Sequence, residues 1–188
     1  VYAVQIVTPY GDIVDLGSPL KKCSTGYCME QLVIGSEGTL GIITQVTLKL
    51  QPLPPYKIDM LAIFHDQMAA IGVVTQLVKA GIDPTSIEYM DNPNVRTTSE
   101  YLEFPGAPHI EDGIYVIITI ETFNEDELDM KMEQASDICE AAGAVDVLEA
   151  DERIWSMRRN CLESVSLISK VCTTDDVVVP VDEMSDMI

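Results

Sequence analysis

The chain has 188 residues, of which 11 are Lys or Arg and 31 are Asp or Glu, so its net charge at neutral pH is −20. A surface this acidic repels the phosphates of nucleic acids and of anionic membranes, so neither is expected as a partner. No apolar run approaches the roughly 20 residues of a membrane-spanning helix, and an apolar fraction of 47% is that of a globular protein. We expect a cytoplasmic protein that meets a membrane only through its partners.

The first 53 residues predict a small β-rich unit. It contains, in order, a β-hairpin at 2–17, a loop at 18–28, a short apolar stretch at 32–34 and a strand at 42–50 with Val46, Leu48 and Leu50 on one face. Pro9 and Gly11 lie at the centre of the hairpin, where they favour a turn.

Two independent signals place a domain boundary after this unit. Three prolines within residues 52–55 make a stiff segment that cannot continue a strand. The charge changes at the same place, because residues 1–58 are neutral overall and residues 59–188 carry the whole net charge of −20. We therefore expect two domains, 1–53 and 54–188.

The second region alternates between predicted strands and helices. Strands are expected at 58–64, 86–90, 113–120 and 144–148, and helices at 66–80, over part of 93–104, at 124–142 and from 151 onward through Leu162. Asp66, Asn124 and Asp151 are the expected N-caps, and Gly81 and Gly143 follow two of the helix ends. The order predicts an α+β fold with a ferredoxin-like (split βαβ) antiparallel sheet and an extra terminal helix.

Three of these elements carry clear burial patterns. The strand at 113–120 is apolar on both faces, which favours a central position in the sheet. The helix at 66–80 is expected to bury Ile71, Val74, Leu77 and Val78, and the helix at 124–142 to bury Leu128, Met132, Ala135, Ile138 and Cys139.

The metal-binding residue types form no motif in the sequence. Five Cys at irregular spacing indicate reduced thiols, because they match neither a zinc ribbon nor a redox CxxC pair. His65 and His109 are expected to be ordinary surface or capping residues. We assign no catalytic residue and no metal ligand within the chain.

The strongest local signal is the glycine-rich segment Gly-Ser-Glu-Gly-Thr-Leu-Gly-Ile-Ile-Thr at 35–44. Three glycines at a spacing of three allow backbone conformations and close approaches that a Cβ would block. Exposed N–H groups in such a loop can bind an anion or the edge of a ring. A tight connection into the following strand is the alternative interpretation.

This segment resembles the FAD-linked oxidases of the vanillyl-alcohol-oxidase type. The ten-residue block is highly specific to the branch of D-lactate dehydrogenase, the glycolate oxidase flavin subunit and D-2-hydroxyglutarate dehydrogenase. Further matches follow in order along the whole chain, at 22–27, 84–91, 155–158 and 175–180.

The resemblance implies a fold and a set of site residues. Residues 1–53 would be the C-terminal part of the FAD-binding domain, and residues 54–188 a cap domain that is incomplete. The residues expected to contact FAD are Gly35, Ser36, Glu37, Gly38, Thr39, Leu40, Gly41, Ile42 and Ile43, and Arg158 is expected to hold the substrate carboxylate.

The chain also departs from the family pattern. Ser24 and Cys28 stand where the family has Asn and Asp, and Thr174 stands where it has Lys, so a second substrate carboxylate is not expected to be bound there. The family's pyrophosphate loop and its His-x-Gly-Asp-Gly-Asn-x-His segment do not occur in these 188 residues. We expect a fragment that lacks both ends, binds FAD weakly alone and is inactive alone.

The implied activity is oxidation of a small 2-hydroxy acid, such as D-lactate or glycolate, by hydride transfer to the flavin. The reduced flavin would pass electrons to an acceptor protein or a quinone, and a homo-oligomer is compatible with the sequence. Two alternatives stay open. One is an acidic module that docks a subunit or an electron-transfer partner, and the other is a flavoenzyme like alkyl-glycerone-phosphate synthase.

Overall fold

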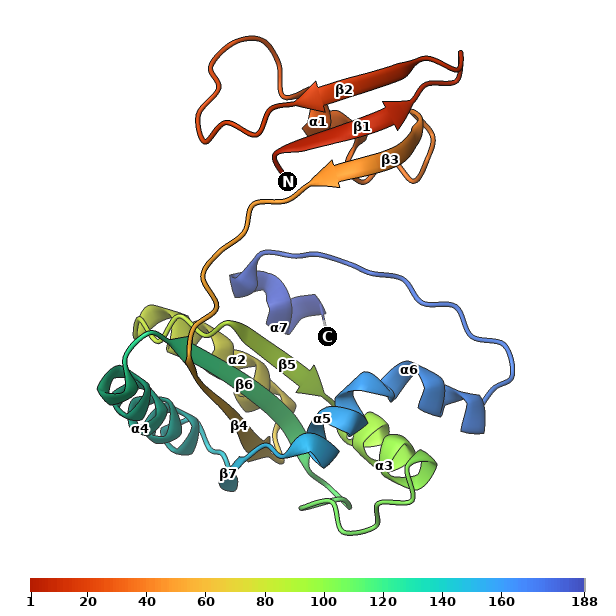
Figure 1. Ribbon diagram of the computed structural model, residues 1–188. Coiled ribbons are helices and arrows are strands. Elements are labelled where there is room, and N and C mark those ends of the chain that lie inside the picture. Colours follow the sequence, from red (N-terminus) through yellow and green to blue (C-terminus); the bar gives the residue numbers. More distant parts are fainter. Residues whose placement is uncertain (188) are drawn as a thin grey trace. The chain divides into compact units, whose positions relative to one another are not determined.

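A computed structural model describes residues 1–187 of the chain. The chain divides into two compact units, Val1–Leu53 and Pro54–Ile188. Each unit contains one antiparallel sheet with helices, so the fold is α+β (Figure 1). Within the described residues, no helix is both long and apolar enough to cross a membrane.

The first unit is a three-stranded sheet with one short helix. Its elements are β1 (Ala3–Val7), β2 (Ile13–Gly17), α1 (Met29–Val33) and β3 (Ile42–Thr47), and the strand order is β2-β1-β3. The predicted hairpin is confirmed, with Gly11 at φ 88° in its turn. The small core consists of Val4, Ile6 and Val33, with Val14 and Leu16 packed against it.

One prediction for this unit was wrong. The strand ends at Thr47, and Leu48 and Leu50 are exposed, because β1 offers no partner beyond the bond from the Tyr2 N–H to the Thr47 carbonyl. Helix α1 overlaps the apolar stretch at 32–34, to which the sequence assigned no secondary structure. With five residues it is too short to show a helical period in the sequence.

The second unit has the predicted order of strands and helices. Its elements are β4 (Tyr56–Phe64), α2 (Gln67–Lys79), β5 (Ser86–Met90), α3 (Asn92–Tyr101), β6 (Ile114–Thr122), α4 (Glu125–Ala141), β7 (Asp146–Glu149), α5 (Glu152–Arg159), α6 (Cys161–Ser164), a 3₁₀ turn at Val165–Leu167, another at Val181–Glu183, and α7 (Met184–Met187). The strand order is β5-β6-β4-β7, and every pair is antiparallel.

Helices cover both faces of this sheet (Figure 1). On one face, the core joins Ala62 and Val116 of the sheet to Leu77 of α2 and Ala135 of α4. On the other face, the core joins alternate strand residues such as Ile63 to α3 and α5. Strand β6 lies between β4 and β5 and is buried along nearly its whole length, which confirms the predicted central position.

The helix caps are confirmed. Asp66, Asn124 and Asp151 each accept a hydrogen bond from a backbone N–H of the first helical turn. The buried face of α4 also matches the prediction, because Ala135 and Cys139 are buried in the core.

The predicted face of α2 was partly wrong. Ile71 and Leu77 are buried, but Ala70 and Val73 complete the inward face, and Val78 is 55% exposed. Positions 70, 73 and 77 share one face of the helix, and the small Ala70 lets α2 approach the sheet along this face. The large apolar residues of the helix do not by themselves identify this face.

The helix that begins after Asp151 is shorter than predicted. It ends at Arg159, and the side-chain amide of Asn160 donates a 2.8 Å hydrogen bond to the Ser156 carbonyl in the last turn. Leu162 therefore belongs to α6 and is exposed.

Candidate functional site

The glycine-rich segment forms the connection from α1 to β3. Three of its residues have positive φ, namely Gly35 (81°), Glu37 (50°) and Gly38 (78°). The Ser36 N–H donates to the Val33 carbonyl, and both the N–H and the hydroxyl of Thr39 donate to the Ser36 carbonyl, at 2.9 and 2.7 Å. The loop is thus a sequence of tight turns that its glycines make accessible.

This loop presents backbone donors outward. Among the described residues, no protein acceptor is found for the N–H groups of Glu37, Gly38 and Leu40. An ideal Cβ at Gly35 or Gly38 would meet no atom within 4 Å, so the surface beside the loop is open. N–H groups displayed in this way suit an anion or the polar edge of a ring.

The end of the segment serves the strand instead. A Cβ at Gly41 would lie 2.9 Å from the Val7 carbonyl oxygen, so this glycine lets β3 begin close against β1. Leu40, Ile42 and Ile43 are exposed apolar side chains beside the outward donors. Residue 41 thus makes a tight connection into β3, and residues 35–40 form tight turns in which several N–H groups have no acceptor among the described residues.

Arg158 lies in the last turn of α5 and forms an ion pair with Glu88 of β5. Its Nε and Nη2 lie 2.9 and 2.8 Å from the same carboxylate oxygen, and the two side chains are 39% and 31% exposed. This is the structural alternative to a substrate-binding role, although the half-exposed guanidinium stays accessible to a ligand.

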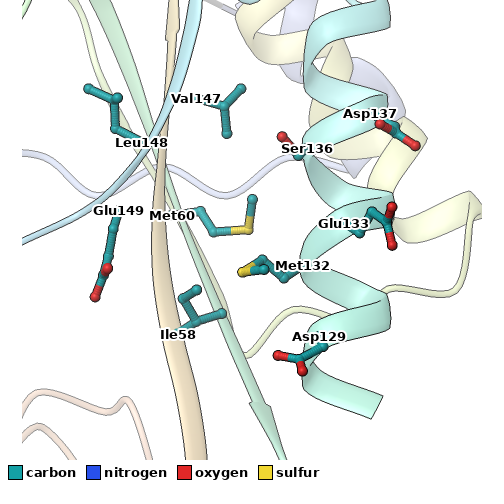
Figure 2. Close-up of a pocket in the computed structure, with 10 residues that line it drawn as sticks. All are labelled: Ile58, Met60, Asp129, Met132, Glu133, Ser136, Asp137, Val147, Leu148 and Glu149. Atoms are coloured by element: carbon teal, nitrogen blue, oxygen red, sulfur yellow. The ribbon is translucent and has the colours of Figure 1, made fainter. Parts of the chain in front are cut away.

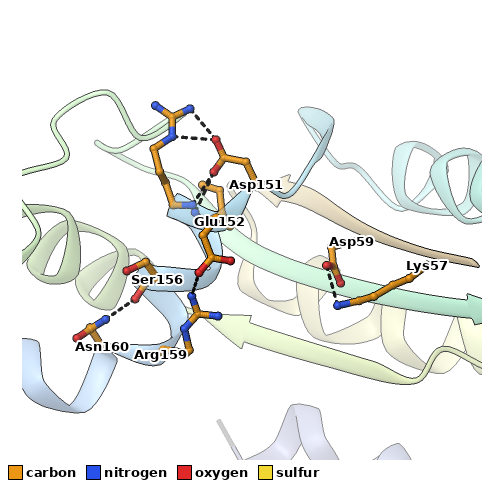
Figure 3. A network of polar contacts seen from close by, with 9 residues as sticks. Lys57, Asp59, Asp151, Glu152, Ser156, Arg159 and Asn160 are labelled. Carbon is orange, nitrogen blue, oxygen red and sulfur yellow. Dashed lines mark hydrogen bonds and ion pairs between the residues drawn. The ribbon is translucent and has the colours of Figure 1, made fainter. Parts of the chain in front are cut away.

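Cations gather around α5 although the second unit is acidic. Lys57, Arg153, Arg158 and Arg159 are four of the eight Lys and Arg residues beyond residue 53. Each has an acidic partner: Lys57 pairs with Asp59 at 3.0 Å, Arg153 with Asp151 at 2.6 Å, and Arg159 with Glu152 (Figure 3).

Trp155 connects this cation group to the sheet. The Lys57 ammonium lies 5.8 Å from the centroid of its ring, and the ring packs against the core on the α3 and α5 face. Its Nε1 is buried and has no hydrogen-bond partner among the described residues. A buried N–H without an acceptor is costly for the fold.

Several residues of this site were missed in the sequence. The sequence assigned no site role to Lys57, Asp59 or Glu88, and the Thr119 hydroxyl donates to Asp59 at 2.6 Å. Strand alternation could have placed Lys57 and Asp59 on one face, opposite to Ile58 and Met60. The partner of Arg158 could not be found in this way, because Glu88 is 70 residues away in sequence.

A pocket of about 500 Å³ lies elsewhere in the second unit, between α4 and strands β4 and β7. Its floor is apolar, and Met60 and Met132 point toward each other across it (Figure 2). Asp129, Glu133, Asp137, Glu149, Ile58, Ser136, Val147 and Leu148 complete its lining, and the first four are exposed acidic residues.

Comparison with protein families decides the classification of the chain. Residues 53–188 match the C-terminal domain of the FAD linked oxidases. The chain belongs to the FAD-linked oxidase family.

Its relatives in this family include enzymes that act on 2-hydroxy acids. The chain is 34% identical to the D-lactate dehydrogenase of Anaerostipes hadrus, covering 100% of the chain and 42% of that enzyme. It is 31% identical to the glycolate oxidase subunit GlcD of Bacillus subtilis, covering 100% of the chain and 40% of that subunit. The chain thus spans less than half the length of these curated relatives.

Solved structures of other proteins share the fold. A structure of alkyldihydroxyacetonephosphate synthase matches 88% of the chain with a TM-score of 0.63 at 21% identity, over 32% of that protein. p-Cresol methylhydroxylase with bound substrate matches 92% of the chain with a TM-score of 0.64 at 14% identity, over 38% of that protein. At these identities the likeness concerns the fold alone.

Proposed function

We propose that the chain is the central part of an FAD-dependent dehydrogenase for small 2-hydroxy acids such as D-lactate or glycolate. Residues 1–53 would complete the FAD-binding domain, and residues 54–188 would form most of the cap. Support comes from the family match and from relatives that are a D-lactate dehydrogenase and a glycolate oxidase subunit.

The outward N–H groups of the glycine-rich loop are the observation that carries this proposal. Glu37, Gly38 and Leu40 offer donors to polar edge atoms of FAD, while the exposed side chains of Ile42 and Ile43 offer apolar surface. Residues Gly35, Ser36, Thr39 and Gly41 shape the loop between them. When bound, FAD would supply the hydride acceptor that no amino-acid side chain can provide.

Arg158 would bind the carboxylate of the substrate. A guanidinium recognises a carboxylate through parallel N–H bonds, and this orients the α-carbon. Glu88 would hold the guanidinium in place, because it already accepts from two of its nitrogens.

A second proposal concerns the electron acceptor. The pocket between α4 and β7 has an apolar floor and an exposed acidic rim, so it suits a basic segment of an acceptor protein. Such attraction would weaken with added salt, because surface charges are screened. The sequence suggested an acidic docking module as an alternative function, and this proposal limits that function to one surface of the second unit.

A hybrid enzyme tests the main proposal. The chain replaces the matching segment of the A. hadrus D-lactate dehydrogenase, to which it is 34% identical. We expect the purified hybrid to retain FAD and to reduce an acceptor dye with D-lactate or glycolate. Arg158→Lys should lower kcat/KM by roughly 10- to 100-fold, as expected for loss of a charge-assisted hydrogen bond.

Arg159→Lys is the matched control, because Arg159 lies on the same helix and pairs with Glu152 instead. It should change kcat/KM by less than about threefold, since exposed ion pairs contribute little. A folded hybrid that retains no FAD, or equal effects of the two substitutions, would contradict the proposal. The 188-residue chain alone should bind FAD only weakly.

A further inference from the structure

We infer that His65, His109 and Asp112 form a binding site for a divalent transition metal, with Zn²⁺ as the preferred ion. One imidazole nitrogen of each histidine and one carboxylate oxygen of Asp112 all lie within 4.8 Å of one another. These are the two histidines of the whole chain, and the fold brings them together from the end of β4 and from the loop before β6. None of these residues belongs to the proposed FAD or substrate sites.

The pair distances describe two neighbouring imidazoles, each of which lies beside a carboxylate. His65 Nε2 lies 3.4 Å from Asp112 Oδ1, and His109 Nε2 lies 3.8 Å from Oδ2 of Asp146, the first residue of β7. The imidazole rings meet edge to face, with centroids 5.8 Å apart. Asp146 is thus placed as a partner that orients His109.

The donor set selects the class of ion. Zn²⁺ takes imidazole nitrogen and carboxylate oxygen in tetrahedral sites, whereas Mg²⁺ and Ca²⁺ prefer oxygen ligands throughout. Ligand atoms bonded at about 2.0 Å to a tetrahedral zinc lie roughly 3.3 Å apart. His65, His109 and Asp112 are exposed, so their side chains can close the remaining distance by rotation without displacing the core.

The loop that carries two of the ligands is held by hydrogen bonds from one partly buried and one buried side chain. The Asn92 side-chain amide donates to the carbonyls of Ile110 and Gly113, both at 3.1 Å, and so anchors the loop on α3. The hydroxyl of the buried Tyr115 donates to the Pro108 carbonyl, directly before His109. The backbone under His109 and Asp112 is therefore positioned before any ion arrives, which metal binding favours.

A close contact fixes the loop against β4. A Cβ at Gly113 would lie 2.6 Å from the His109 carbonyl oxygen and 3.2 Å from Cγ2 of Ile63. The loop can lie this close to the end of β4, where His65 follows, only because residue 113 is glycine. His109 itself has φ 47°, a conformation that non-glycine residues adopt rarely. A bound ion would tie the β4 end to this loop and to β7.

Zinc titration of the chain tests the inference. The exposed Cys23, Cys28 and Cys172 also attract zinc, so they are first blocked by alkylation of the folded protein. Isothermal titration with ZnCl₂ should then show about one bound ion per chain, with magnesium giving no heat of binding. His65→Asn and His109→Asn should each weaken zinc binding by at least about tenfold.

Glu111→Gln is the matched control, because it removes an exposed negative charge beside Asp112 without removing a ligand of the cluster. It should leave zinc affinity within about twofold, while Asp112→Asn weakens binding clearly. Thermal unfolding of each variant without metal establishes that it is folded. Absence of binding by the alkylated wild-type chain, or binding that survives both histidine substitutions, would overturn the inference.

Discussion

Arg158 and Glu88 meet through a single carboxylate oxygen. The guanidinium Nε and Nη2 lie 2.9 and 2.8 Å from Glu88 Oε2, so the pair does not have the two-oxygen, two-nitrogen geometry of a full fork. Both side chains are also partly exposed to solvent. The pair therefore orients Arg158 more than it stabilises the fold.

A double-mutant cycle measures how much the Arg158–Glu88 ion pair contributes to the free energy of unfolding. We expect Arg158→Ala and Glu88→Ala to couple by only about 0.2–1 kcal/mol in the free energy of unfolding, because solvent screens a half-exposed pair. Urea unfolding followed by circular dichroism gives the four stabilities. A coupling well above 2 kcal/mol would mean that the pair is structural, and it would weaken the case for Arg158 as a ligand-binding residue.

Local signals in the sequence were sufficient for much of the second unit. A cap such as Asp66 or Asn124 acts on the next turn of its own helix, and the apolar faces of β6 lie within nine consecutive residues. The predictions that failed concern features that depend on contacts between different elements of the fold. The end of β3 depends on where β1 begins, and the exposure of Val78 depends on how α2 approaches the sheet.

The same division applies to the candidate sites. The glycine-rich loop is continuous in sequence, so its motif was visible, and the structure adds which of its N–H groups face outward. The Arg158–Glu88 pair and the His65–His109 cluster join residues that are far apart in the chain. No periodicity connects such residues, so only the folded topology could bring them together.

Two glycine substitutions in the second unit should have opposite effects. Gly72 lies inside α2, and a Cβ there would meet no atom within 4 Å, so Gly72→Ala should stabilise the unit by about 0.5–1 kcal/mol. Gly113→Ala should destabilise it, because its Cβ would lie 2.6 Å from a backbone oxygen. Urea unfolding followed by the fluorescence of Trp155, the one Trp in the chain, compares them. Equal effects would contradict the packing described for residue 113.

The cap of α5 should make stability depend on pH. The hydrogen bond from the Arg153 side chain, with those from the backbone N–H groups of Ile154 and Arg153, holds the pKa of Asp151 below its ordinary value of 3.8. The resulting stabilisation is fully present above that ordinary value, and it is lost as the pH falls through the lowered pKa of the folded state.

Two substitutions of Asp151 separate the contribution of the helix-capping hydrogen bond to stability from that of the carboxylate charge. Asp151→Ala should cost about 1 kcal/mol near neutral pH, and Asp151→Asn should cost less, because an amide oxygen still caps the helix. Solvent exposure keeps the contribution of the charge itself small. Urea unfolding of the three proteins at pH 7 and pH 3 measures both effects. The acid-dependent loss should be smaller in Asp151→Asn than in the wild type, and an equal loss would assign it to other carboxylates.

The cysteines should differ strongly in reactivity. Cys139 lies on the buried face of α4, and this burial, with a smaller effect of Glu140, raises its pKa to about 12, so almost none of it is thiolate at pH 8. Cys23, Cys28 and Cys172 are exposed, so iodoacetamide should modify them at least about a hundredfold faster than Cys139. Mass spectrometry of peptides at timed intervals gives the rates, and labelling in urea is the control that should make all the rates similar. Because the raised pKa means that the folded state holds this proton more tightly, its contribution to stability is present below the ordinary value of 9.0 and is lost as the pH rises toward 12. Rapid modification of Cys139 in the native protein would mean that the core between α4 and the sheet opens readily.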